Sequence, residues 1–227
     1  MDFSSFSPAL VIATVVSLAL APFVAVMVTS FTKIVVVISL LRNALGLQQT
    51  PPNVVINGLA IILSIYVMYP VILDTVDSIG TGVAVSALTG GDSSEKLSVD
   101  RLGQMINTGK EPLRKFLIKH SHERERTFFL EGAKRLLPPQ QQADLTANDF
   151  IVVMPAFTVS ELTEAFQIGF LLFLPFIVVD LIVSNILLAL GMMMLSPTMV
   201  SLPFKLLLFV ILDGWAKLVH GLVATYR

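Results

Sequence analysis

The sequence contains no cysteine and few charged residues, and each scarcity excludes a class of protein. Without cysteine among its 227 residues, the chain cannot form disulfides, thiolate metal sites or a cysteine nucleophile. Charged residues make up 14% of the chain and hydrophobic residues 55%, with a mean hydropathy of +0.82. This composition is too apolar for an ordinary soluble domain and predicts a membrane protein.

The sequence also lacks an excess of positive charge, and it contains no recognisable catalytic motif. Lys and Arg number 15 against 16 acidic residues, so a basic face for nucleic acid is not expected. Neither a glycine-rich phosphate loop nor a Ser/His/Asp arrangement can be recognised. His120 and His122 are two residues apart, which on a helix directs them about 200° from each other and argues against a metal site. The sequence thus predicts a protein that is not an enzyme and uses no metal or cofactor.

What the chain does contain is long runs without charge. Two such runs predict hydrophobic helices at roughly 9–41 and 54–73. Between them lies the short connection QQTPPN: Gln48, Gln49, Thr50, Pro51, Pro52 and Asn53. The two prolines cannot continue a helix and Asn53 can cap the next one, so an antiparallel hairpin is expected.

The middle of the chain, 92–149, holds most of the charged residues and belongs in water or at an interface. The small-residue stretch Gly80–Ser94 reads as a linker, and a helix is expected to open at Glu111-Pro112 and to end in Pro138–Asp144. Its apolar face has i, i+3, i+4 and i+7 spacing: Leu113, Phe116, Leu117 and His120. We expect amphipathic helices that pack on a neighbour, with the HERERT run as a solvated face.

From Phe150 onward the chain is apolar again and predicts a second hairpin, whose turn is GMMMLSP, Gly191–Pro197. The predicted fold is an all-α membrane protein of three parts: a hydrophobic hairpin (1–77), a linker and charged helical segment (78–149), and a second hydrophobic hairpin (150–227). A turn rich in methionine can be explained simply as an apolar turn that dips into lipid or packs on a neighbour.

Six charged residues lie inside or beside the hydrophobic runs. An ionised side chain at the centre of a bilayer costs ~2.5–3.5 kcal/mol, so these residues should be paired and should face protein or water. Glu161 and Glu164 share one helix face, and Lys205 and Asp213, eight residues apart, would share another. Pairs of acid and lysine across helices are therefore expected. The full set is Lys33, Glu161, Glu164, Asp180, Lys205 and Asp213.

The same charges leave two other functions open. Asp180 and Asp213 could form the dyad of an intramembrane aspartyl protease, although LDGW lacks the glycine-framed aspartate of such enzymes. A secondary transporter for a small solute would use broken helices around charges at the membrane midplane. The prolines that could break helices are Pro22, Pro70, Pro155 and Pro175.

Three long strings carry a family resemblance. They are LLRNALGLQQTPPNVVINGLA (Leu40–Ala60), PAFTVSELTEAFQIGFLLFLPFIVVDLIV (Pro155–Val183) and GMMMLSPTMVSLPFKLLLFVILDGW (Gly191–Trp215). In these strings the chain resembles the FliP/SctR family, the core export-apparatus proteins of bacterial type III secretion systems. The resemblance covers both hydrophobic halves and is looser in the middle segment.

The resemblance implies a pore-forming subunit of an export gate in the bacterial inner membrane. Members of this family assemble as a pentamer with SctS/FliQ-like and SctT/FliR-like proteins into a ring or spiral through which unfolded proteins pass. The assembled core would project to the periplasmic side, so that the apolar helices need not all span the lipid bilayer. Other export components and membrane lipid complete the implied partners.

The start of the chain bears on the choice between injectisome and flagellum. MDFSSFSP contains Asp2 and no Lys or Arg, and Pro22 would follow a cut after Ala21, so we expect the first helix to be retained rather than cleaved as a signal. Flagellar members usually carry a cleaved signal. The resemblance is therefore stronger to an injectisome SctR than to a flagellar FliP.

The resemblance also implies roles for particular residues. Met192, Met193 and Met194 match the methionine loop that lines the pore of the family as a deformable gasket. Glu161 in SELTEAF and Lys205 in FKLLLF match a pair that bridges adjacent subunits.

Overall fold

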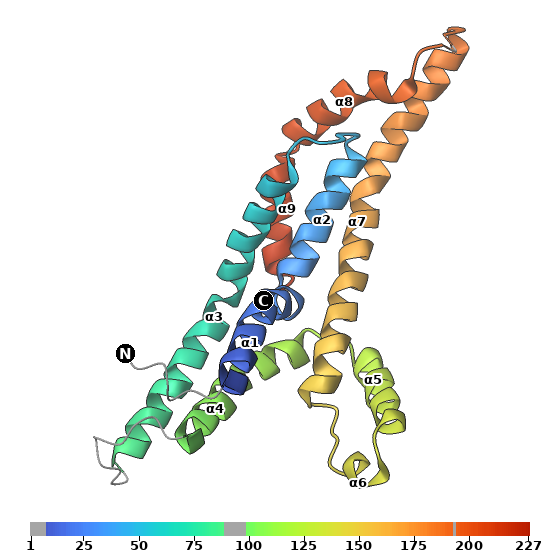
Figure 1. Cartoon of the computed structure of the whole chain (residues 1–227). Helices are drawn as coiled ribbons and strands as arrows, with labels where there is room; N and C mark the ends of the chain where they lie inside the picture. The colour runs from blue at the N-terminus through green and yellow to red at the C-terminus, as the bar shows by residue number, and fades with distance from the viewer. Residues whose placement is uncertain (1–7, 89–98, 193) are drawn as a thin grey trace.

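The computed structural model describes residues 8–88, 99–192 and 194–227, and this described part is helical and contains no strand (Figure 1). The expected all-α fold is confirmed. Two long helices, α3 and α7, flank α2 and α9, and α4 to α6 gather at one end of an elongated molecule. The helices are α1 (Pro8–Met27), α2 (Phe31–Ala44), α3 (Asn53–Leu88), α4 (Val99–Lys119), α5 (Glu123–Leu136), α6 (Pro139–Gln142), α7 (Phe150–Ala189), α8 (Pro197–Ile211) and α9 (Gly214–Ala224).

The first hairpin consists of α2 and α3, which pack against each other on either side of the proline-containing turn. Helix α2 ends in a Schellman motif, in which Gly46 has a φ of 79° and its N–H donates to the carbonyl of Asn43 at 3.0 Å. Asn53 opens α3 as expected but does not cap it. Its Oδ1 accepts a hydrogen bond from Nη1 of Arg42 at 2.6 Å, which ties the two helices together at the turn.

The predicted single helix at 9–41 is wrong, because the chain breaks at 28–30 and turns by 62° between α1 and α2. Side-chain hydroxyl groups form hydrogen bonds at this break. Thr32 Oγ1 donates to the carbonyl of Val26 at 2.9 Å, and Ser30 Oγ donates to Ser64 Oγ of α3 at 3.1 Å. A side-chain donor thus satisfies one of the carbonyl groups that the end of α1 leaves free.

The middle segment is also more broken than expected. Glu111-Pro112 does not open a helix: Pro112 lies inside α4, which begins at Val99, and a corner at 120–122 separates α4 from α5. The expected linker at 80–94 is helical as far as Leu88, because α3 continues into it, and its remainder, 89–94, lies outside the described residues. Leu117 of α4 is fully buried and α4 packs on α3, so the predicted amphipathic packing is confirmed.

The second hairpin has its turn where the sequence places it, but its returning helix is broken. The 40-residue helix α7 leads to the methionine turn, and α8 and α9 then meet at 62° across Leu212 and Asp213. Asp213 has a left-handed φ of 51°. Gly214 follows it, and a Cβ there would lie 2.2 Å from the ring of Phe209, so any larger residue would force the ring or the backbone to move.

The core is built around α2, whose buried positions have the spacing of one helix face: Ile34, Val37, Ile38 and Leu41. This face meets α3, α7, α8 and α9 in one cluster, and a second cluster joins α3, α4 and α7 to Tyr226. Outside these clusters, large apolar side chains are exposed along α1, α3 and α7. Among the described residues two helices, α3 and α7, are long and apolar enough to cross a membrane, and the number of candidate spans rises to four if each bent pair is one span.

Candidate functional site

The methionine turn is the tip of the second hairpin, and local backbone chemistry explains its shape. Helix α7 ends in a second Schellman motif: the N–H of Met192 donates to the carbonyl of Leu187 at 2.9 Å. Gly191 provides the left-handed residue, with a φ of 73°. Pro197 then opens α8 as its first residue, where its missing N–H costs nothing. Gly191 and Pro197 bound the turn as the sequence suggests.

The apolar side chains described in this turn are half-exposed or fully exposed. Met194 is 101% exposed and Met192 45%, and Leu195 beside them is 51% exposed. Met193 lies outside the described residues. The turn projects at the end of the molecule opposite α4 to α6 (Figure 1). A group of apolar side chains at an exposed tip is expected where another surface covers them.

A buried ion cluster lies between α2 and α7, on the side of the α1–α2 break. Lys33 and Glu161 are both fully buried, and the Lys33 Nζ lies 3.0 Å from Glu161 Oε1 and 2.7 Å from Glu164 Oε2. Both contacts are ion pairs by distance, and neither has the alignment of a hydrogen bond. The predicted pairing of acid and lysine across helices is confirmed here. One lysine therefore contacts two carboxylates taken from neighbouring turns of one helix.

Tyr226 and two histidines complete this cluster. The Tyr226 hydroxyl donates to Glu161 Oε2, and the Lys33 Nζ lies 4.2 Å from the centre of the tyrosine ring. His122 Nε2 lies 3.5 Å from Glu164 Oε1. Burial, and then the neighbouring cations, lower the pKa of His120 to about 4, so its ring is neutral in the folded protein at pH 7.

The corner between α4 and α5 is fastened to α7 beside this cluster. The N–H of His122 donates to Ser160 Oγ at 2.9 Å, and that hydroxyl in turn donates to the carbonyl of Ala156 at 2.8 Å. The ion cluster and this bond together attach the charged middle segment to both hydrophobic hairpins.

A second ion pair lies nearer the methionine turn and joins α7 to α8. Lys205 Nζ is 2.7 Å from Asp180 Oδ2 and also donates to the carbonyl of Ala44 at 3.1 Å, near the end of α2. Ser201 Oγ, fully buried, donates to Asp180 Oδ1 at 2.6 Å. Three helices thus meet at one lysine.

This geometry bears on two expectations about Lys205. The idea that Lys205 and Asp213 share a helix face is wrong, because α8 ends at Ile211 and the chain bends before Asp213. Within the described chain Glu161 and Lys205 form no ion pair with each other, since each has another partner. A bridge between subunits involves a second chain, so it stays a prediction.

The arrangement gives no support to an aspartyl protease dyad. Both carboxylate oxygens of Asp180 accept hydrogen bonds, one from Ser201 and one from Lys205. Asp213 is exposed at the α8–α9 break, and no contact joins it to Asp180 among the described residues.

Sequence reasoning did not identify three members of these clusters: Ser160, Ser201 and Tyr226. Ser201 lies one helical turn before Lys205, and Ser160 stands next to Glu161, so a search for hydroxyls beside charged residues could have found both. Tyr226 gives no such signal, because its partners are far away along the chain.

Comparison with known proteins decides the family. The FliP family profile matches residues 14–222, which is most of the chain. The chain belongs to the FliP family. The family resemblance predicted from the three sequence strings is therefore confirmed.

Proteins of several bacteria resemble this chain along nearly its whole length. The Yop proteins translocation protein R of Yersinia pestis is 53% identical over 209 residues, covering 92% of each chain. The hypersensitivity response secretion protein HrcR of Ralstonia nicotianae is 50% identical over 212 residues, covering 93% of this chain and 94% of the relative. The flagellar biosynthetic protein FliP of Cereibacter sphaeroides is 41% identical over 218 residues, covering 95% of this chain and 66% of that protein.

Proposed function

We propose that this FliP-family chain is a pore-forming subunit of a type III secretion export gate in the bacterial inner membrane, through which unfolded proteins pass. The observation that carries the proposal is the exposed methionine turn at the tip of the second hairpin. Family membership supports it, as do relatives whose names refer to secretion and translocation. The higher identity to those relatives than to the flagellar one favours an injectisome.

In this proposal the methionine turns of several copies meet around an axis and close the pore. A gasket must close around nothing and then around a polypeptide of changing shape, so its side chains must repack at low cost. Methionine has three rotatable bonds and a polarisable thioether and adapts where leucine or isoleucine would hold one shape. A closed ring of such apolar groups also excludes water and ions by dewetting. Met192, Met193 and Met194 would supply this ring.

The proposed assembly is a pentamer of this chain together with SctS/FliQ-like and SctT/FliR-like proteins. The large apolar side chains exposed along α1, α3 and α7 are consistent with extensive contacts to other chains and to lipid. In this role the protein performs no chemistry of its own, and other components would drive the passage of substrates. The assembled core would project to the periplasmic side.

Replacing Met192, Met193 and Met194 together by alanine tests the gasket. We expect a higher ion conductance through the assembled gate, measured in planar bilayers, because the shorter side chains leave the constriction open to water. Met199→Ala is the matched control, since Met199 is 73% exposed but lies on α8 beyond the turn. An unchanged conductance in a fully assembled triple variant would contradict the gasket.

One feature favours the alternative of a small-solute transporter: two bent helix pairs, α1–α2 and α8–α9, with buried lysines in α2 and α8. The native mass of the protein purified together with the products of neighbouring genes separates the two functions. A large hetero-oligomer is expected for an export gate, and a single chain or simple homo-oligomer for a transporter.

A further inference from the structure

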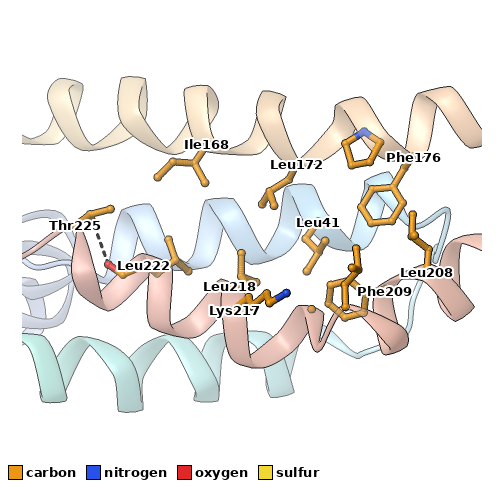
Figure 2. A pocket seen from close by; sticks show the side chains of 14 residues that line it. Leu41, Ile168, Leu172, Phe176, Leu208, Phe209, Lys217, Leu218, Leu222 and Thr225 are labelled. Carbon is orange, nitrogen blue, oxygen red and sulfur yellow. Dashed lines mark hydrogen bonds between the residues drawn. The ribbon is translucent and has the colours of Figure 1, made fainter.

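An apolar cavity of about 410 Å³ opens between α2, α7, α8 and α9, and no member of the two ion clusters lines it (Figure 2). Leu172 and Phe176 of α7 form one wall, and Leu218 and Leu222 of α9 face them from the other. The volume is that of a small-molecule site, which usually lies between about 300 and 1,000 Å³. The cavity is therefore large enough to hold a ligand, and its apolar side chains suit an apolar ligand.

Lys217 is the one charged side chain that lines this cavity. Its side chain lies beside Leu218 at the edge of the apolar wall (Figure 2). Lys217 is exposed and forms no ion pair within the described chain, even though Asp213 lies one turn earlier. Thr225, the other polar lining residue, already donates its hydroxyl to the carbonyl of Leu222 at 2.7 Å. The cavity thus combines an apolar interior with one uncommitted cation at its rim.

A glycine keeps part of this space open. Gly221 lines the cavity, and a Cβ built on it would meet no atom within 4 Å. Gly214, which also lines the cavity, differs because a Cβ there would collide with Phe209. A larger side chain at position 221 would consequently find open space at the lining of the cavity.

We propose that this cavity binds an acyl chain of a membrane phospholipid whose anionic headgroup is held by Lys217. The apolar walls match a hydrocarbon chain, which needs no hydrogen-bond partners. A lysine can bury its methylene stem along such a wall and keep its ammonium at the polar edge. Basic positions between apolar helices attract anionic lipid headgroups in this way. A helix of a second chain would leave the charge of Lys217 without a partner unless it supplied an acid.

Native mass spectrometry of the full-length protein, extracted in detergent together with any chains that copurify, tests this lipid site. After delipidation, the sample is titrated with dioleoyl phosphatidylglycerol and, separately, with the zwitterionic dioleoyl phosphatidylcholine. We expect about fivefold tighter binding of the anionic lipid, the effect of one lysine near a headgroup. Equal binding of the two lipids would overturn the role of Lys217.

Two variants with matched controls separate the parts of the site. Gly221→Leu should obstruct part of the cavity and weaken the binding of both lipids, whereas Gly58→Leu, at an equally open glycine on α3, should not. Lys217→Gln should remove only the preference for the anionic lipid, and Lys134→Gln on α5 should leave it intact. Wild-type lipid binding by Gly221→Leu would overturn the proposal.

The absence of native cysteine allows one more test, which asks whether protein fills the cavity instead. A single Gly221→Cys variant is labelled in native membranes with a short reagent that joins a thiol-reactive maleimide to a photoreactive group, which can attach to any side chain beside it on illumination. We expect no crosslink to another chain, because lipid occupies the space. An efficient crosslink to a second copy or to a partner protein would overturn the proposal.

Discussion

Lys33 is the residue on which the larger ion cluster depends, because it is the cation that contacts both Glu161 and Glu164. Replacing it by methionine keeps the length of the side chain but leaves the fully buried Glu161 without its cation. Removing one partner of a buried ion pair costs ~3–5 kcal/mol. We expect Lys33→Met to lower the free energy of unfolding in detergent by this amount, measured by denaturant titration.

The control for this experiment is to remove the orphaned charge as well. The double variant Lys33→Met with Glu161→Gln should recover most of the lost stability, because no unpaired ion remains in the interior. Glu164→Gln alone should cost less, since the side chain of Glu164 is 32% exposed and water can solvate it. A Lys33→Met protein as stable as the wild type would show that the cluster contributes nothing.

The sequence was sufficient to predict that these charges are paired but not to predict the pairs. A lone lysine in an apolar run must find an acid, and that argument needs no structure. Which acid it finds depends on how α2 and α7 lie against each other, and the two helices are more than a hundred residues apart. Lys205 illustrates the limit, because its carboxylate partner is Asp180 rather than the nearby Asp213.

At the level of helices, the hydropathy pattern located the apolar segments but did not predict where the helices within them break. A charge-free run averages to one long helix, yet α1 and α2 separate where Thr29 and Ser30 interrupt it. The break between α8 and α9 falls on Asp213-Gly214, a dipeptide typical of turns, inside an otherwise apolar string. Pro112 produced the opposite error. The sequence predicted that a helix begins there, whereas Pro112 lies inside the continuous helix α4.

Gly214 allows the α8–α9 break to be tested directly. Gly214→Ala would place a methyl group 2.2 Å from the ring of Phe209, so either the ring or the start of α9 must move. Such overpacking typically costs 1–3 kcal/mol, and we expect a lower thermal unfolding midpoint in detergent. Gly58→Ala on α3 is the control, because its Cβ meets open space and alanine is the better helix former. Equal midpoints for the two variants would mean that the break tolerates a side chain.

For the whole molecule, the length of α7 limits what the lipid bilayer can contain. Its 40 residues extend about 60 Å, whereas the hydrocarbon core is ~30 Å thick. A substantial part of α7 therefore lies outside hydrocarbon in any orientation close to the membrane normal. This agrees with the expectation that correctly predicted helices need not be bilayer spans, and it leaves long apolar surfaces for other chains to cover.

The proposed bridge between Glu161 and Lys205 of adjacent subunits can be distinguished from the pairs within one chain by exchanging charges. If the bridge forms, Glu161→Lys and Lys205→Glu should each weaken the assembled complex on native gels. The double exchange should restore the complex only in part, because opposite charges would again face each other between subunits while each chain loses its own Lys33–Glu161 and Lys205–Asp180 pairs.

Exchanging charges within the chain gives the opposite expectation. The variant Asp180→Lys with Lys205→Asp keeps the intrachain pair seen at 2.7 Å but presents an acid to the neighbouring subunit's Glu161. It should therefore fold with near wild-type stability and still assemble poorly, since two carboxylates would meet. If this variant assembles normally and the exchange of Glu161 with Lys205 does not, then Lys205 acts within its own chain by joining α2, α7 and α8 beneath the methionine turn.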